Sequence, residues 1–209
     1  MITGDVNLPL ILLAALIATG SPGPATLAIA GTSMASGRRY GLALAAGVTT
    51  GSLTWSIAAA AGLSVVMLAN AWAFEAMRYL GAAYLIFLAV KSARSALKPD
   101  APAATKILAP TLTAAYRRGL LLHLTNPKAI LFFGSLYAVG VPAGSSPATL
   151  AVVIAAIGIQ SLVVFHGYAL LFSSPPMTAG YAKLRRWFEA VFAVAFAAAG
   201  IKILTARLN

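Results

Sequence analysis

The chain of 209 residues is 60% hydrophobic and only 9% charged, with a mean hydropathy of +0.89. Soluble domains typically carry about 25% charged residues, so no soluble fold of this length can cover so much apolar sequence, and an integral membrane protein is indicated. The net charge of +11 does not indicate a nucleic-acid partner, because the basic residues lie between apolar segments. With no cysteine and two histidines, the sequence predicts neither a metal site nor another cofactor.

A membrane-spanning helix needs roughly 20 apolar residues, and six segments of the chain meet this requirement. In chain order they are residues 6–36, 42–69, 72–90, 116–139, 147–172 and 187–204. We therefore expect an all-α polytopic membrane protein with six transmembrane helices, forming a single transporter domain over residues 1–209. The polar, proline-containing stretch 91–115 is expected to be a cytoplasmic linker between two halves, 1–90 and 116–209.

The first and fourth segments are each interrupted by proline. Ser21-Pro22-Gly23-Pro24 breaks the first segment and Thr125-Asn126-Pro127 breaks the fourth, because proline has no N–H and clashes with the preceding helical turn. Irregular backbone inside a membrane is tolerated only where it faces protein or a water-lined cavity. Pro127 follows Pro24 by 103 positions. Broken helices at matching positions of two halves indicate an inverted 3+3 repeat and are typical of small-solute transporters.

The distribution of Lys and Arg predicts the orientation in the membrane. With six spans, one side receives the loops at 37–41, 91–118 and 173–186, which hold eleven of the fifteen basic residues. Three lie on the opposite side, and Lys128 lies within a span. We therefore expect both termini outside and the central linker in the cytoplasm, where anionic lipid would attract it.

Short motifs along the whole chain carry a resemblance to a known family. They are Ser21-Pro22-Gly23-Pro24 with Gly37-Arg38-Arg39-Tyr40-Gly41, then Leu80-Gly81-Ala82-Ala83-Tyr84-Leu85, and finally Tyr116-Arg117-Arg118-Gly119-Leu120 with Asn126-Pro127-Lys128-Ala129. In this order they resemble the lysine-exporter (LysE-type) family of bacterial amino-acid efflux proteins, in its homoserine/threonine branch. The resemblance implies an inner-membrane exporter of amino acids or small relatives, driven by the proton gradient or the membrane potential without ATP.

The chain departs from this family at one position. The family often has an acidic or amide residue directly after the glycine at position 51, where this chain has Ser52. A serine cannot carry a proton as a carboxylate does, and it interacts only weakly with an ammonium group. A cationic substrate such as lysine is therefore less expected than a neutral amino acid, and the group that carries a coupling proton stays open.

The two proline breaks supply candidate groups for binding an amino acid. The half-helices that begin at Pro24 and Pro127 offer free N–H groups and positive dipole ends, which suit a carboxylate. The carbonyls of Gly20 and His123, freed by the prolines, can accept hydrogen bonds from the ammonium group. The candidate substrate-binding residues are Gly20, Ser21, Pro22, Gly23, Pro24, Ser52, Thr125, Asn126, Pro127 and Lys128. The alternative is that the prolines only kink the helices for packing.

Four polar side chains have two interpretations each. Asn126 either bonds a ligand or caps the half-helix that follows it. Lys128 either serves a site near the membrane midplane, where a charge costs at least ~2.5 kcal/mol, or extends toward the cytoplasm. His123 and His166 either titrate during proton coupling or make hydrogen bonds between helices.

The sequence as a whole predicts a secondary transporter that exports an amino acid, or a close derivative, by alternating access between its halves. The alternative is a membrane scaffold or assembly protein without transport activity. An enzyme is not expected, because no nucleophile–base pair is recognisable and no catalytic residue is assigned. The expected partners are the amino-acid substrate and the lipid bilayer. The small-residue spacing from Gly47 to Gly51 fits helix packing within the monomer or at the interface of a homodimer.

Overall fold

All regular structure in the part of the chain that is described is helical. The computed structural model describes residues 6–69, 71–97, 109–142 and 144–205. Within these ranges the helices are α1 (Leu8–Gly20), α2 (Pro24–Ser36), α3 (Arg38–Ala69), α4 (Ala71–Leu97), α5 (Leu112–Leu124), α6 (Pro127–Gly140), α7 (Pro147–Leu171) and α8 (Pro175–Thr205). The all-α fold is thereby confirmed.

Each apolar segment of the sequence corresponds to one helix or to one broken pair of helices. The first segment forms α1 and α2, which are bent by 53° at the first break, and the fourth forms α5 and α6 on either side of the second break. By length and composition, the described residues contain two helices able to cross a membrane alone, Arg38–Gly62 and Pro147–Leu171. The bent pair α1–α2 makes a third candidate, and α6 is a shorter apolar helix.

The boundaries of the predicted linker 91–115 need correction, because both of its ends are helical. Helix α4 continues to Leu97, and α5 begins at Leu112. The last turns of α4 are held on α8, where Ser95 Oγ donates to Glu189 Oε1 at 2.8 Å. Thr111 starts α5 by accepting a hydrogen bond from the backbone N–H of Ala114 at 3.1 Å. These side-chain contacts extend the helices past the point where the apolar sequence stops.

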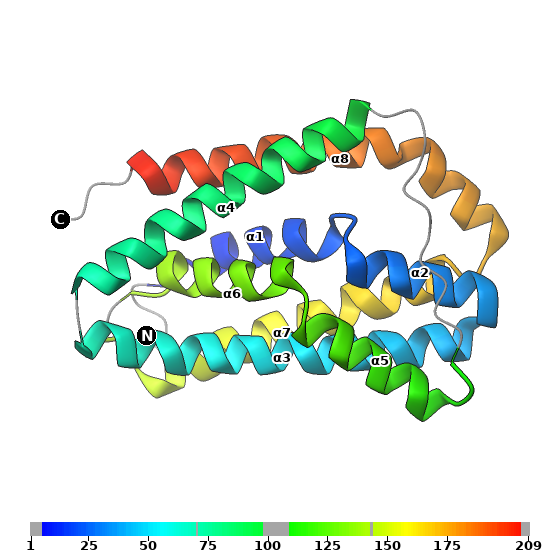
Figure 1. Ribbon diagram of the computed structural model, residues 1–209, viewed down its shortest axis with the longest axis horizontal. Coiled ribbons are helices and arrows are strands. Elements are labelled where there is room, and N and C mark those ends of the chain that lie inside the picture. Colours follow the sequence, from blue (N-terminus) through cyan, green and yellow to red (C-terminus); the bar gives the residue numbers. More distant parts are fainter. Residues whose placement is uncertain (1–5, 70, 98–108, 143, 206–209) are drawn as a thin grey trace.

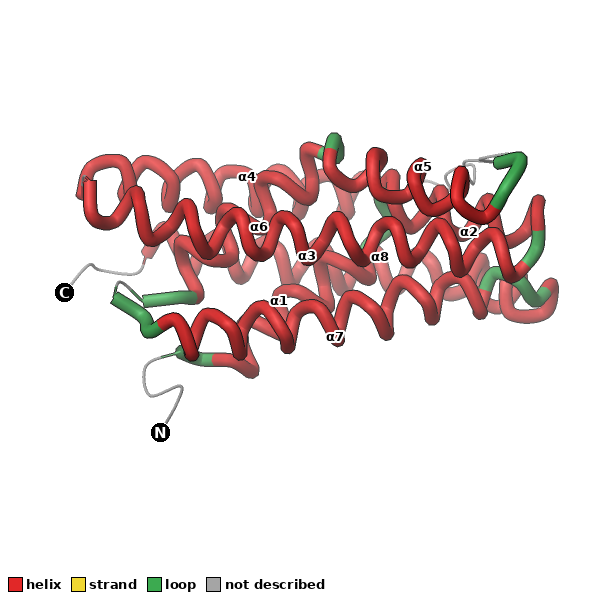
Figure 2. Tube along the Cα trace, turned by 90° about the horizontal axis from the view of Figure 1, so that it is seen from below, coloured by secondary structure: helices red, strands yellow, loops and turns green. Residues whose placement is uncertain are grey.

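The helices form an elongated bundle in which both breaks lie midway along the length (Figure 1). Helix α3 packs against α5 and α7, whereas α4 packs against α8. The tube drawing, turned by 90°, shows the same lengthwise arrangement (Figure 2). Two apolar clusters fill the interior: one includes Ala18 of α1 with Phe132 and Phe133 of α6, and the other includes Ala25 of α2 with Phe165 of α7. The breaks therefore lie where these two clusters meet.

Glycines allow α5 to approach α3 at backbone distance. A Cβ placed on Gly47 would lie 2.0 Å from the Tyr116 carbonyl oxygen, and one on Gly119 would lie 2.2 Å from the Leu44 carbonyl oxygen. Farther along the same contact, a Cβ on Gly51 would lie 2.9 Å from His123 Cβ. The glycine spacing in α3 thus serves packing within the monomer, and this packing brings the end of α5 to the centre of the bundle.

Candidate functional site

The first break, Ser21–Gly23 between α1 and α2, satisfies the carbonyl groups that its prolines leave without helical donors. Ser21 Oγ donates to the Ala18 carbonyl at 3.1 Å, and the Tyr168 hydroxyl of α7 donates to the Gly20 carbonyl at 2.6 Å. The Gly20 carbonyl, which the sequence predicts to meet the substrate ammonium, therefore already accepts one of the two hydrogen bonds that a carbonyl oxygen can accept.

The first turn of α2 is closed by its own threonine. Thr26 Oγ1 accepts a hydrogen bond from the Gly23 backbone N–H at 2.9 Å and donates to the Gly23 carbonyl at 3.1 Å. A helix N-terminus presents unpaired N–H groups only until a side chain caps them. One of the N–H groups expected to bind a carboxylate is therefore already engaged.

The second break, Thr125–Asn126 between α5 and α6, is capped by the side chain of its N-cap residue, Asn126. Asn126 is 5% exposed, and its Oδ1 accepts a hydrogen bond from the Lys128 backbone N–H at 3.0 Å. The Asn126 N–H donates to the His123 carbonyl at 3.2 Å, so this carbonyl too already accepts a hydrogen bond within the protein. Asn126 therefore acts as the helix cap, which is one of its two interpretations, and its side chain also lines the pocket described below.

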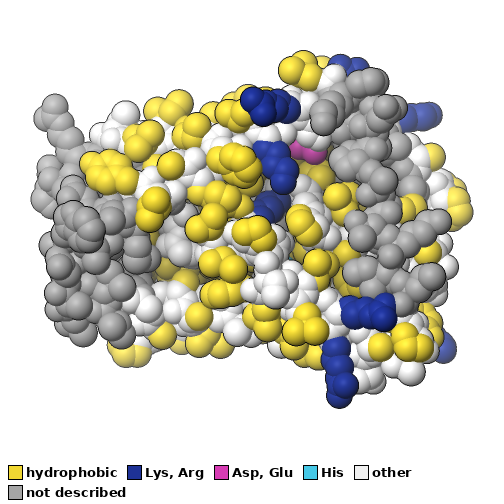
Figure 3. Space-filling model, viewed as in Figure 1, with side chains coloured by type: hydrophobic (Ala, Val, Ile, Leu, Met, Phe, Trp, Pro, Cys, Tyr) yellow, Lys and Arg dark blue, Asp and Glu magenta, His cyan; other side chains and the backbone are white. Residues whose placement is uncertain are grey.

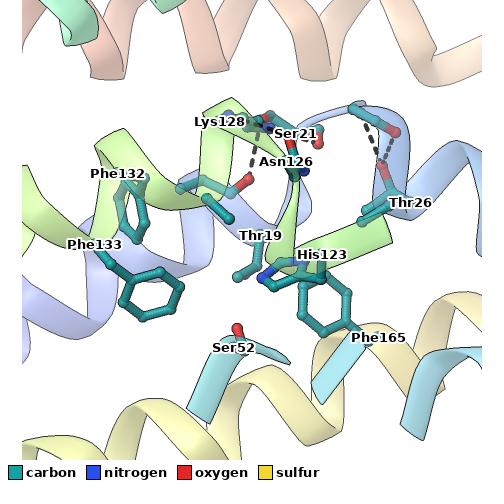
Figure 4. A pocket seen from close by; sticks show the side chains of 14 residues that line it. Thr19, Ser21, Thr26, Ser52, His123, Asn126, Lys128, Phe132, Phe133 and Phe165 are labelled. Atoms are coloured by element: carbon teal, nitrogen blue, oxygen red, sulfur yellow. Dashed lines mark hydrogen bonds between the residues drawn. The ribbon is translucent and has the colours of Figure 1, made fainter. Parts of the chain in front are cut away.

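Lys128 links the second break to the first. Its Nζ donates to the Ser21 carbonyl oxygen at 3.1 Å and also to Ser21 Oγ (Figure 4). Gly23 leaves room for this side chain, because a Cβ at that position would lie 3.3 Å from both Cδ and Nζ of Lys128. The lysine thus stays at the breaks and does not extend toward the cytoplasm.

A pocket with about 390 Å³ of empty space, part of it open to solvent, lies between the two breaks. Its lining residues are Ala18, Thr19, Ser21, Gly23, Ala25, Thr26, Ser52, His123, Asn126, Lys128, Ala129, Phe132, Phe133 and Phe165. The close-up shows Lys128, Ser21 and Asn126 along one side, with Ser52 on the side facing them (Figure 4). Polar groups at one side and aromatic rings at another give the pocket the character of a small-molecule site.

His123 is the unusual member of this lining. The side chain is 5% exposed, and neither Nδ1 nor Nε2 has a hydrogen-bond partner. Its ring meets Phe165 edge to face, with centroids 5.8 Å apart. Ser52 lies on the same pocket, is 1% exposed, and places its Oγ 3.3 Å from Ser161 Oγ of α7.

The structure brings some of the predicted residues to the pocket and leaves others away from it. Ser21, Gly23, Ser52, His123, Asn126 and Lys128 line it, whereas Gly20, Pro22, Pro24, Thr125, Pro127 and His166 do not. The prolines act by shaping the backbone around the pocket. His166 Nδ1 lies 2.9 Å from the Leu162 carbonyl of its own helix, so this contact lies within α7 and does not join two helices.

Sequence reasoning missed the aromatic wall and two threonines. Phe132 and Phe133 lie on α6, just after the second break, and Phe165 lies on α7. Thr19 and Thr26 flank the first break in sequence, and their hydroxyls near a proline break are a signal that the sequence did contain. The phenylalanines gave no such signal, because an aromatic residue in an apolar helix is usually a packing residue.

Comparison with known proteins identifies the family. The model of the LysE type translocator family matches residues 16–207. This chain belongs to that family. It is 31% identical over 199 residues to the threonine efflux protein of Escherichia coli (strain K12), covering 92% of this chain and 94% of the relative. The threonine efflux protein of Salmonella typhi is 30% identical over 194 residues with the same coverage.

A second kind of relative matches a shorter part of the chain. The leucine efflux protein of Salmonella choleraesuis (strain SC-B67) is 36% identical over 134 residues, or 64% of this chain and 63% of the relative. No solved structure matches the chain. The resemblance drawn from the motifs is confirmed, and the chain is a multi-pass membrane protein of the bacterial inner membrane, a translocator and not an enzyme.

Proposed function

We propose that this protein is a secondary transporter that exports neutral amino acids through the pocket between its two breaks. The observation that carries this proposal is the position of Lys128, a cation at the middle of the bundle whose side chain lines the pocket. A charged residue inside a membrane segment is costly and marks a transport function by default. The relatives named for threonine and leucine efflux support a neutral amino acid as the substrate.

Lys128 is the group that binds the substrate carboxylate. The N–H groups of Gly23 and Lys128 at the two helix starts are already bonded to Thr26 and Asn126, which leaves the ammonium of Lys128 as the stronger anion-binding group. In the structure this ammonium is bonded to Ser21. A carboxylate makes a stronger, charge-assisted hydrogen bond than a neutral oxygen does, so it displaces Ser21.

The rest of the lining favours an uncharged substrate side chain. Among the residues described as lining the pocket, none is acidic, and Ser52 occupies the position where the family often has an acidic or amide residue. A second positive charge on the substrate would therefore lack a partner in a site of low polarity, which is unfavourable. Phe132, Phe133 and Phe165 provide apolar surface for a substrate side chain.

Six spans arranged as an inverted 3+3 repeat fit the way the helices pack. In such a repeat α1 and α2 correspond to α5 and α6, α3 corresponds to α7, and α4 corresponds to α8. The α3–α5 contact then corresponds to α1–α7, and the α3–α6 contact corresponds to α2–α7. All four of these contacts are present. The pairs α3–α7 and α4–α8 map onto themselves. Several contacts depart from this pattern: α4 packs on α6 whereas α8 packs on α1, and the contacts α2–α3 and α3–α4 have no counterparts of similar size in α6–α7 and α7–α8. Rocking of one half against the other around the breaks provides alternating access.

The placement of charge supports an orientation with both termini outside. On the face drawn in Figure 3, the described Lys and Arg side chains lie between the middle of the bundle and the end where α2 ends and α5 begins. The start of α1 and the end of α8 lie toward the other end (Figure 1). Basic residues mark the cytoplasmic side.

Export is driven by the proton gradient or the membrane potential. His123 is better placed than His166 to take part in proton coupling, because His123 lines the pocket.

The test is efflux from cells preloaded with a mixture of amino acids. Cells with the intact protein should lose one or a few neutral amino acids faster than cells without it. Lys128→Ala should slow this efflux by about 10- to 100-fold, since hydrogen bonds to charged groups contribute ~1.5–3 kcal/mol. Lys183→Ala, which changes an exposed lysine of α8, is the matched control and should leave efflux unchanged.

Membrane insertion of each variant is measured in the same cells. Equal loss of every amino acid with and without the protein would contradict the proposal and favour a membrane scaffold. Full efflux by an inserted Lys128→Ala variant would leave a transporter but remove Lys128 as the carboxylate-binding group.

A further inference from the structure

The two ring nitrogens of His123 lack partners although the side chain is buried. Unsatisfied buried polar atoms carry a free-energy penalty, and in native structures most such groups are paired with protein, water or a ligand. The other polar groups around the pocket differ in this respect. Thr19 donates to the Ala15 carbonyl at 2.7 Å, and Ser52 lies within hydrogen-bond distance of Ser161. The imidazole therefore lines the pocket with both of its ring nitrogens buried and unpaired.

We propose that His123 determines the specificity of the pocket by hydrogen-bonding a hydroxyl group on the side chain of the amino-acid substrate. The protein would then prefer hydroxyl-bearing amino acids over apolar ones of the same size. This inference rests on the proposed function, because it assigns a role within the same pocket.

The position of His123 in the pocket suits the side chain of a substrate held by Lys128. His123 lies in the last turn of α5, before the second break, and Lys128 lies in the first turn of α6, after the break. In the close-up, Lys128 lies beside Ser21 at one side, and the His123 ring lies between that side and Ser52 (Figure 4). An amino acid whose carboxylate is at Lys128 therefore directs its other groups toward His123 and the phenylalanines.

The chemistry of a neutral imidazole favours a hydroxyl over an ammonium group or an apolar side chain. A neutral histidine has one N–H donor and one acceptor nitrogen, and a hydroxyl also has one donor hydrogen together with acceptor lone pairs. An ammonium group can only donate, so it can pair with the acceptor nitrogen of the ring but not with its N–H. An apolar side chain would leave both ring nitrogens of His123 unpaired. A hydroxyl can thus pair with either nitrogen of His123, whichever tautomer is present.

Two contacts hold the imidazole in place for this role. Phe165 meets its ring edge to face, and Gly51 of α3 lies directly behind it. A Cβ on Gly51 would lie 2.9 Å from His123 Cβ and 3.3 Å from Cδ2, closer than a methyl group can sit without a shift. Gly51 is therefore a positioning residue, because an alanine there would move the ring that reads the substrate.

The experiment compares threonine with valine, which have nearly the same shape and differ in one hydroxyl group. Transport of each is measured in proteoliposomes of the full-length protein, and the ratio of the two kcat/KM values is the readout. A site built to hydrogen-bond a substrate hydroxyl rejects the analogue without it by up to about 10⁴–10⁵. For this partly open pocket we expect the intact protein to prefer threonine by about tenfold or more.

Two variants of His123 and one variant of Gly51 test whether His123 sets the preference for threonine. His123→Leu should bring the ratio close to one, whereas His123→Gln, which keeps a donor and an acceptor but does not titrate, should retain most of the preference. Gly51→Ala should lower the preference without changing any polar atom. The control variants His166→Leu and Gly62→Ala should leave it unchanged, since His166 does not line the pocket and a Cβ on Gly62 meets nothing within 4 Å.

Each remaining outcome decides against one proposal or the other. An unchanged ratio in an active His123→Leu variant would overturn the specificity role while leaving amino-acid export intact. If His123→Gln lowered the transport of threonine and valine equally and transport no longer responded to a protonophore, the specificity role of His123 would be overturned in favour of a role in proton coupling. Failure of the intact protein to transport any amino acid would instead contradict the proposed function itself.

Discussion

The two breaks look alike in sequence, but they contribute differently to the pocket. The first break supplies mainly backbone and small groups: the Ser21 carbonyl and hydroxyl, the Gly23 backbone and the hydroxyl of Thr26. The second break supplies the two large polar side chains of the pocket, His123 and Lys128, one on each side of Asn126. Two breaks of the same kind thus contribute unequally, because the large polar side chains of the pocket come from the second break alone.

The capping of both breaks explains why side chains carry the chemistry. In each break some of the backbone groups named as substrate ligands already have partners within the protein, such as Tyr168 on the Gly20 carbonyl and Asn126 on the Lys128 N–H. Buried backbone groups are nearly always paired in this way. What remains unpaired is His123, and what can exchange partners is Lys128. A proline break creates the space for a site without itself being the set of ligands.

The largest effect is expected where the second break depends on contact with α3. A methyl group at Gly119 would lie 2.2 Å from the Leu44 carbonyl oxygen, so Gly119→Ala must push α5 away from α3. Overpacking of this kind typically costs about 1–3 kcal/mol and sometimes more. We expect a clear fall in the thermal unfolding midpoint of the purified protein together with loss of transport. Gly134→Ala, where a Cβ meets nothing within 4 Å, should change neither; equal stability of the two variants would contradict the close contact.

A smaller effect should separate the two helix caps. Asn126→Ala and Thr26→Ala each remove the side chain that caps a half-helix, and loss of a cap typically costs ~1 kcal/mol. Both variants should therefore be destabilised to a similar degree, which a thermal melt measures. Transport should fall more for Asn126→Ala, because the Asn126 side chain caps the half-helix that carries Lys128. A larger transport defect in Thr26→Ala would reverse the roles assigned to the two breaks.

Much of the fold was predictable because its signals are local in sequence. The apolar segments gave the helices, the prolines gave the breaks, and the motifs around them gave the family, which Asn126-Pro127-Lys128 helped to identify. The asparagine cap is also a local signal, since its acceptor lies two residues before the N–H that it binds.

The pairing of the polar groups was not predictable, because it depends on residues far apart in the chain. Tyr168 reaches Gly20 across 148 positions, and Lys128 reaches Ser21 across 107. No pattern in the sequence specifies which side chain of a neighbouring helix will satisfy a freed carbonyl. The extension of α4 to Leu97 has the same cause, because its last turn is stabilised by α8 and not by its own apolar sequence.

The most direct test of the central claim pairs one change in the protein with one change in the substrate. The apparent affinity of purified protein for threonine and for threonine methyl ester, which lacks the carboxylate charge, is measured with the intact protein and with Lys128→Ala. If Lys128 binds the carboxylate, the intact protein should prefer the free acid by about 10- to 100-fold, and the variant should bind both alike. Such a cycle isolates the interaction between the two groups. The same preference for the free acid in both proteins would contradict the account and place the carboxylate elsewhere.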